Sequence, residues 1–356
     1  MRAFLFLFLL PLTCFGNLSP KGEVHSITLA IGEPRSKKDR DSGKKIEAPF
    51  SVWIPEGDTP LKGLIMNPFY EPAVNQKHWQ AAAAHWGFGM LGANLAKVKA
   101  TELGNMTEKG LAALAEKSGH PELKTIKLCL VGMSAGGGMS TRIAEHLPNR
   151  VLAAAPVCLE VGPRDEASRK IPMITIFGEK DGRQMKQLLE KLPPARELGA
   201  KWGIAVQWGR RHEFGQANNL ILPFFDAIIN NEIDPAYGDV TNWKPADKGL
   251  AWLPNAKVAA VWEAFVEKDR KVKIRQPLGL GDKQEFVIHQ AGESITVEIT
   301  SKIEGSIKIY NGNTLLGENS PMQIPKLSAG IHSIIAVVTD ASGKQWRSRP
   351  HTIIVR

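Results

Sequence analysis

Residues 125–140 read TIKLCLVGMSAGGGMS, and this stretch decides the fold class. The largely apolar run 125–131 predicts a buried β-strand, and 135–147 predicts a helix that ends before Pro148. Between them lies the pattern G-x-S-x-G, whose small residues permit a tight, strained turn that exposes a serine. We therefore predict Ser134 as a nucleophile at a helix N-terminus, where partial positive charge favours an oxyanion. A phosphate-binding turn is the alternative, but no lysine follows at phosphate-loop spacing.

Strands and helices alternate on both sides of this turn, from residue 24 to about 232. The expected strands are 24–30, 49–54, 63–66, 87–95, 125–131, 151–158, 171–177 and 204–208. The expected helices are 76–86, 107–117, 135–147, 182–192 and 217–229, with Pro193–Pro194 ending the fourth and a polar loop over Pro34–Lys45. This alternation predicts an α/β protein with a mainly parallel sheet and helices on both faces, which with a nucleophile elbow is typical of α/β-hydrolases.

A serine nucleophile needs a base, and the base needs an acid that orients it. In α/β-hydrolases the chain order is serine, acid, histidine. Asp181 follows the strand 171–177 and is favoured as the acid, with Glu179 and then Glu160 as alternatives. His212 follows the last expected strand and is the only histidine between residues 146 and 289. The predicted triad is Ser134–Asp181–His212.

An oxyanion hole needs two N–H donors. Ala135, directly after the nucleophile, is expected to supply one. The loop after the third strand should supply the other, and because Pro68 has no N–H, the donor is expected at Phe69 or Tyr70. Tyr70 can instead line the substrate pocket. Such chemistry requires no metal and no cofactor.

Only twelve residues, Leu159–Lys170, separate two successive strands at the place where hydrolases of this type usually carry a lid. Twelve residues are too few for a helical cap. We therefore expect an open site, which suits a bulky or polymeric ester better than a small buried one.

Beyond Lys273 the helical period disappears, and short alternating runs predict a β-sandwich. Asn311–Gly312 is a hairpin signal within this part. Trp243, Trp252 and Trp262 lie in a preceding segment that we expect to pack on the hydrolase domain. The expected division is a signal peptide at 1–16, a catalytic domain at 17–270 and an immunoglobulin-like sandwich at 271–356.

The N-terminus has the features of a signal peptide: Arg2, the apolar run Ala3–Leu12, and small residues before a cut after Gly16. Ten apolar residues are too few to span a bilayer, although a buried first strand is an alternative. The protein is therefore expected to be secreted or periplasmic. Pro11–Leu12 disfavours a lipoprotein modified at Cys14.

The remaining composition is that of a globular enzyme. The chain has 356 residues and a net charge of +9, with its Lys and Arg residues spread along the sequence. The densest cluster, 35–45, contains Asp39 and Asp41, so we expect a solvated surface and no nucleic-acid site. Cys129 and Cys158 lie in apolar runs, which favours buried thiols over a disulfide, and their spacing suggests no metal site.

Residues 132–140 resemble the nucleophile region of secreted polyhydroxybutyrate depolymerases and of feruloyl or acetylxylan esterases. Residues 309–317 and 329–332 are similar to bacterial immunoglobulin-like modules attached to secreted enzymes. These resemblances imply a carboxylic ester hydrolase that forms an acyl-enzyme on polysaccharide-linked or polymeric esters. They also imply that the C-terminal module serves as a spacer or contacts a surface or carbohydrate.

Two other functions remain open at this point. The first is a serine peptidase of the prolyl-oligopeptidase type, although the N-terminal part is too short for a propeller domain. The second is a non-catalytic binding or adhesion protein on a hydrolase scaffold, although such proteins typically lose a triad residue. A cytoplasmic thioesterase is disfavoured by the signal peptide.

Overall fold

The computed structural model describes residues 19–159, 165–234, 251–275 and 288–356. The expected signal peptide, Glu160 and Trp243 lie outside these ranges. No helix in the described ranges has both the length and the apolar character needed to cross a membrane.

An eight-stranded sheet with the order β1-β2-β4-β3-β5-β6-β7-β8 forms the centre of the N-terminal part. Its strands are β1 (Gly22–Ala30), β2 (Glu47–Pro55), β3 (Gly63–Asn67), β4 (Phe88–Ala93), β5 (Lys127–Met133), β6 (Val151–Val157), β7 (Met173–Gly178) and β8 (Trp202–Gln207). β2 is antiparallel to both of its neighbours, whereas β3 to β8 are parallel to one another. This arrangement is the α/β-hydrolase fold, and it confirms the predicted fold class.

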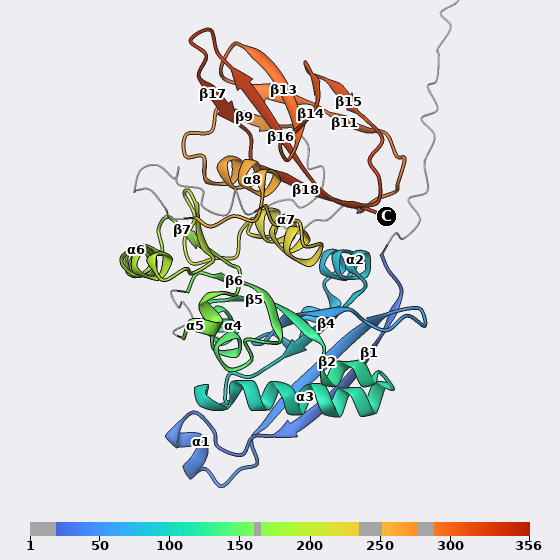
Figure 1. Ribbon diagram of the computed structural model, residues 1–356, viewed down its shortest axis with the longest axis vertical. Coiled ribbons are helices and arrows are strands. Elements are labelled where there is room, and N and C mark those ends of the chain that lie inside the picture. The colour runs from blue at the N-terminus through green and yellow to red at the C-terminus, as the bar shows by residue number, and fades with distance from the viewer. Residues whose placement is uncertain (1–18, 160–164, 235–250, 276–287) are drawn as a thin grey trace, which may run out of the picture.

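Helices cover both faces of the sheet (Figure 1). One face carries α2 (Lys77–Trp86), α7 (Asn218–Ile229) and α8 (Ala256–Val266), and the other carries α3 (Leu103–Ser118) and α4 (Ala135–His146). Two short helices, α1 (Lys37–Asp41) and α5 (Glu166–Arg169), lie in connections, and α6 (Gly182–Glu197) follows β7. Because parallel strands need crossover connections, this two-sided cover follows from the alternation in the sequence.

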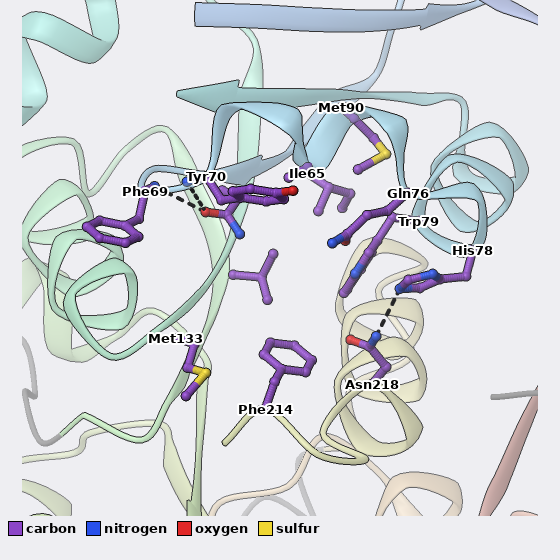
Figure 2. A pocket seen from close by; sticks show the side chains of 13 residues that line it. Ile65, Phe69, Tyr70, Gln76, His78, Trp79, Met90, Met133, Phe214 and Asn218 are labelled. Carbon is purple, nitrogen blue, oxygen red and sulfur yellow. Dashed lines mark hydrogen bonds between the residues drawn. The ribbon is translucent and has the colours of Figure 1, made fainter. Parts of the chain in front are cut away.

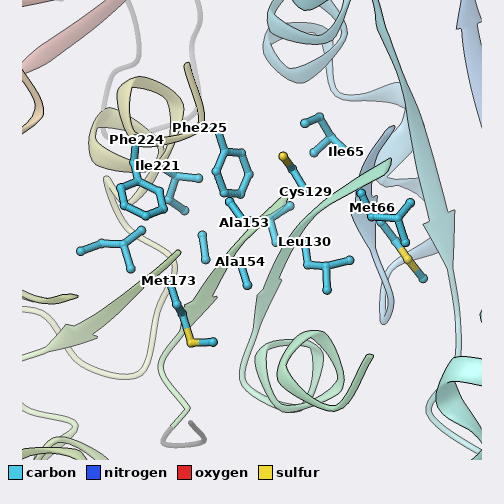
Figure 3. Close-up of a cluster of buried hydrophobic side chains, with 14 of the residues drawn as sticks. Ile65, Met66, Cys129, Leu130, Ala153, Ala154, Met173, Ile221, Phe224 and Phe225 are labelled. Carbon is cyan, nitrogen blue, oxygen red and sulfur yellow. The ribbon is translucent and has the colours of Figure 1, made fainter. Parts of the chain in front are cut away.

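The central strands bury both of their faces, which explains their continuous apolar runs. Figure 3 shows Cys129 and Ala153 directed toward Phe225 of α7, while Leu130 and Ala154 point to the opposite face. All five side chains are buried. The small residues of β6 allow helices to pack closely on both sides of it.

The structure corrects two details of the sequence prediction. Pro193–Pro194 does not end α6, which continues to Glu197. Proline has a helical φ but removes a backbone donor, and the helical hydrogen bonding resumes after the two prolines, where Leu198 N–H donates to Pro194 O at 3.2 Å. The expected loop at 34–45 contains the short helix α1, whose first turn is capped by the Ser36 hydroxyl.

The C-terminal part consists of β-strands in two layers. The larger layer has the order β10-β18-β16-β13-β14, with β17 paired to β16, and the pairs β9–β12 and β11–β15 form the rest. The strands are β9 (Val272–Ile274), β10 (Ile288–His289), β11 (Ile295–Val297), β12 (Ile299–Ser301), β13 (Ser306–Asn311), β14 (Thr314–Glu318), β15 (Met322–Ile324), β16 (Gly330–Thr339), β17 (Gln345–Arg347) and β18 (His351–Val355). The hairpin signal at Asn311–Gly312 is confirmed, because Asn311 pairs with Thr314 across the turn.

This β-module is docked on the hydrolase helices. β16 and β18 pack on α7, and Ile331 and Ile354 belong to the same apolar cluster as the hydrolase core. The side-chain oxygen of Asn219 accepts a hydrogen bond from Thr352 N–H at 2.8 Å. The module is therefore held against the catalytic part by apolar and polar contacts.

The segment before the module packs on the sheet, as expected for its tryptophans. Trp262, in α8, is buried and donates through its indole N–H to Ile204 O of β8 at 2.7 Å.

Candidate active site

Ser134 occupies the sharp turn between β5 and α4. Its backbone has φ 53° and ψ −121°, a conformation that L-residues other than glycine adopt rarely. Its N–H donates to Val157 O on the neighbouring strand at 2.8 Å, and its carbonyl accepts from Gly138 N–H at 3.1 Å. Strain of about 1–3 kcal/mol at such a residue persists only when the surroundings impose it, and it is common at active sites.

The glycines around Ser134 are required by close backbone approach. A Cβ atom at Gly132 would overlap the carbonyl group of Gly136, so position 132 accepts no residue other than glycine while the turn keeps this shape. A Cβ atom at Gly136 would lie only 2.9 Å from Cβ of Phe69. The turn therefore lies directly against the loop at 67–70, where the second oxyanion donor is expected.

The structure brings Asp181 and His212 together. Oδ2 of Asp181 lies 3.0 Å from Nδ1 of His212. The Asp181 side chain follows β7 and is only 13% exposed, whereas the His212 side chain, in the loop after β8, is 44% exposed. A largely buried carboxylate on Nδ1 fixes the imidazole so that Nε2 is left for a nucleophile, which is the arrangement that a general base requires.

Backbone contacts hold the acid loop against the histidine loop. A Cβ atom at Gly178 would overlap the carbonyl oxygen of Arg211, and Lys180 N–H donates to Arg210 O at 2.8 Å. The Glu179 carboxylate accepts from Gly209 N–H at 3.0 Å. Glu179, the alternative acid, is thus engaged in holding the histidine loop, while Asp181 contacts His212.

Gln207 is a residue that the sequence analysis missed. It is buried at the end of β8, its Nε2 donates to Phe214 O at 3.1 Å, and its Oε1 accepts from Gln216 N–H at 2.8 Å. These bonds close the far end of the loop that carries His212. The sequence feature that could have identified Gln207 is its polarity, since it ends an otherwise apolar strand.

Cys158 is the second residue whose role the sequence did not reveal. Its Sγ, the Asp181 carboxylate and the His212 ring offer ligand atoms within 4.8 Å of one another, so this trio could hold a metal ion. Burial raises the pKa of the Cys158 thiol to about 11, and the Asp181 carboxylate acts in the same direction. The Cys158 thiol donates a hydrogen bond to Glu213 O at 3.3 Å, which places it under the histidine loop.

The loop expected to supply the second oxyanion donor is ordered by Asn67. Its side-chain oxygen accepts hydrogen bonds from Phe69 N–H at 3.1 Å and from Tyr70 N–H at 3.0 Å. Both predicted donors are thus engaged within their own loop. The Nδ2 amide of Asn67 has no hydrogen bond among the described residues, so Asn67 itself offers a donor at this place.

A pocket of about 200 Å³ opens beside these elements (Figure 2). It is lined by Met133, which directly precedes Ser134, and by Asn67, Phe69 and Tyr70 of the oxyanion loop. Tyr70 therefore does line a pocket, and the side chains of Phe69 and Tyr70 are exposed. The pocket therefore lies beside the turn that carries Ser134.

Neither a protein-family model nor a curated protein matches the chain. Among solved structures, it is similar to a zinc-bound, cold-adapted esterase from an Arctic intertidal metagenomic library, with 16% identity, a TM-score of 0.39, and 60% of this chain and 96% of that chain covered. It is similar to Candida antarctica lipase A in its closed state, with 10% identity, a TM-score of 0.40, and 59% and 78% covered. Fibronectin(III)-like modules of Clostridium thermocellum CbhA match with 23% identity, a TM-score of 0.21, and 24% and 93% covered. The resemblance to polyhydroxybutyrate depolymerases and feruloyl esterases stays a prediction.

Proposed function

We propose that this protein is a serine hydrolase of carboxylic esters. His212 Nε2 takes the proton from Ser134 Oγ, which attacks the ester carbonyl, and Asp181 holds the ring and stabilises its charged form. His212 then donates that proton to the leaving alcohol. Water hydrolyses the acyl-enzyme with His212 again acting as base. No step of this mechanism requires a metal or a cofactor.

The hydrogen-bonded pair Asp181–His212, positioned after two strands that lie on one side of the Ser134 strand, carries the proposal. In parallel strands the carboxyl ends meet at one edge of the sheet, so the three residues share that edge. The strained backbone of Ser134 supports a functional reading, because a merely structural turn could avoid the strain with glycine.

The developing oxyanion is proposed to lie between Ala135 N–H and the loop at 67–70. Phe69 N–H and Tyr70 N–H remain candidates, but both already donate to Asn67. Nδ2 of Asn67, which has no partner in the described part of the chain, is a donor of the kind that oxyanion holes use, since side-chain amides serve there in other hydrolases.

The proposed substrates are esters of polysaccharides or other polymers. His212 is 44% exposed and Ser134 is half-buried, which supports a site that a bulky ester can reach. Export through the predicted signal peptide would bring the protein to such substrates. The docked β-module would extend the surface beside the catalytic part, and it suits contact with a carbohydrate or a surface better than service as a flexible spacer.

The direct test is release of nitrophenolate from p-nitrophenyl acetate by the purified protein and by Ser134→Ala. We expect activity in the parent and its loss in the variant. Ser118→Ala is the control, because Ser118 lies at the end of α3, where its hydroxyl donates to Leu114 O and accepts from His120 N–H. Background-level release from all three proteins, repeated with a larger ester, would overturn the proposal and favour a binding protein.

A further inference from the structure

The pocket beside Met133 has apolar walls and a polar end (Figure 2). Ile65, Trp79, Met90, Val131 and Phe214 provide apolar lining. The polar end is formed by His78 of α2 and Asn218, the first residue of α7. Their exposed fractions are only 5% and 9%.

His78 fixes the orientation of the Asn218 amide. Nδ2 of Asn218 lies 3.0 Å from Nε2 of His78. Burial lowers the pKa of His78 to about 4, so its ring is neutral at ordinary pH. In the tautomer with the proton on Nδ1, Nε2 accepts a hydrogen bond from the Asn218 amide. An amide that donates through Nδ2 to this ring must direct its oxygen elsewhere.

That oxygen has no hydrogen-bond partner among the described residues. Oδ1 of Asn218 is buried and unpaired in the part of the chain that the structure describes. In Figure 2 it points away from His78, on the side of the pocket where Phe214 lies. Buried polar atoms are nearly always paired, and an exception in a pocket beside a nucleophile indicates an acceptor kept for a ligand.

The position of the pocket assigns it to the acyl side of an ester. The leaving alcohol must receive its proton from His212, so it has to lie on the side of that ring. His212 does not line the pocket, whereas Met133 and the oxyanion loop, which flank the carbonyl group, do. The acyl chain is therefore the part that can enter.

We propose, on the basis of the proposed esterase function, that this pocket selects compact acyl groups carrying a hydroxyl that donates to Asn218 Oδ1. The volume of about 200 Å³ lies below the roughly 300–1,000 Å³ of pockets for drug-sized ligands, so a compact acyl group suffices to fill it. The apolar walls accept the hydrocarbon part. A site built to bond a hydroxyl discriminates strongly against an analogue that lacks it, because its own polar group is then left unpaired.

The test compares matched methyl esters at two chain lengths by following acid release. Methyl 3-hydroxybutanoate is paired with methyl 3-methylbutanoate, and methyl 3-(4-hydroxyphenyl)propanoate with methyl 3-(4-methylphenyl)propanoate. In each pair a methyl replaces the hydroxyl at nearly constant shape. We expect kcat/KM to favour the hydroxyl compound by about 10-fold or more in the pair whose length reaches Asn218.

Two variants examine the residue itself. Asn218→Leu removes the acceptor at similar volume and should abolish or reverse the preference, whereas Asn218→Asp retains an acceptor and should keep it. The readout is the ratio of the kcat/KM values of two substrates on one protein, so it does not depend on the fraction of the protein that is folded. A ratio near one in the parent for both pairs, or an unchanged ratio in Asn218→Leu, would overturn the inference.

The same experiment separates failure of this inference from failure of the proposed function. Hydrolysis of p-nitrophenyl acetate that depends on Ser134, without any preference within the pairs, would leave the esterase proposal standing and reject the hydroxyl-selective pocket. Absence of Ser134-dependent hydrolysis for every ester would reject both.

Discussion

Asp181 Oδ2 lies 3.0 Å from His212 Nδ1, although 31 residues separate the two along the chain. Glu179, two residues before Asp181, instead accepts from Gly209 N–H. One carboxylate therefore orients the imidazole ring, and the other holds the backbone of the loop that carries it.

This division of roles predicts different effects for two isosteric changes. Asp181→Asn should lower kcat by roughly 10⁴-fold, because an amide cannot stabilise the imidazolium and favours the wrong tautomer. Glu179→Gln keeps an oxygen acceptor for Gly209 N–H and should lower kcat less than about 10-fold. Steady-state hydrolysis of p-nitrophenyl acetate measures both, and a larger loss in Glu179→Gln would reassign the acid.

The predicted order of the site residues followed from local signals. The turn at Ser134, the strand ends before Asp181 and His212, and the chain order are all visible in sequence, because each depends on neighbouring residues. The parts that were missed depend on contacts between distant segments. Gln207 differs from its strand only in being polar, and Cys158 continues an apolar run, so their contacts with the loop after β8 are known only from the folded structure.

Helix α6 shows a second kind of limit. Pro193–Pro194 is a strong helix-breaking signal, yet the helix continues because buried Leu188 and Leu192 anchor the turns before it. Tertiary packing therefore outweighs a local signal here. Asn67 is similar: its turn signal was visible, but its bonds to two expected oxyanion donors were not.

Gly178 is predicted to be irreplaceable for a steric reason. A Cβ atom there would overlap the Arg211 carbonyl oxygen, and displacement of this loop moves His212 away from Asp181. Gly178→Ala should lower kcat by about 10²-fold, the scale expected for a misplacement of about 1 Å. Gly32→Ala is the control, because no atom lies within 4 Å of its added Cβ. Equal kcat values for the two variants would show that the loop adapts.

Asn67 is expected to act both through its oxygen and through its amide. Asn67→Ala releases Phe69 N–H and Tyr70 N–H, whereas Asn67→Asp keeps an acceptor for them but loses Nδ2 and places a negative charge beside the oxyanion. Both variants should lower kcat by about 10²- to 10³-fold, with the larger loss in Asn67→Asp. Full activity of Asn67→Asp in the same ester assay would assign Asn67 to loop order alone.

Asp226 is predicted to stabilise the junction with the β-module. It is buried, accepts from Trp86 Nε1 at 2.9 Å and lies 3.4 Å from Lys257 Nζ, which in turn donates to Ile331 O of β16. Asp226→Ala should lower the free energy of unfolding by about 3–5 kcal/mol, because it removes both the buried acceptor of Trp86 Nε1 and the carboxylate partner of the Lys257 ammonium. Glu318→Ala breaks an exposed pair with Lys308 of the same length, 3.4 Å, and should cost less than about 1 kcal/mol. Urea denaturation followed by tryptophan fluorescence measures both, and similar losses would contradict the assigned role.

The buried ring of His78 predicts a dependence of stability on pH. Burial lowers the pKa of His78 to about 4, whereas an unfolded chain has a histidine pKa near 6.5. Between these two values the unfolded chain binds a proton at His78 and the folded protein does not, so the free energy of unfolding falls as the pH is lowered through this window. The full effect amounts to about 3 kcal/mol. His78→Gln, which cannot titrate, should show a shallower decline between pH 6.5 and 4.5 in urea denaturation. If the free energy of unfolding depended on pH in the same way in the parent and in His78→Gln, His78 would bind a proton as readily in the folded protein as in the unfolded chain, and the prediction would be wrong.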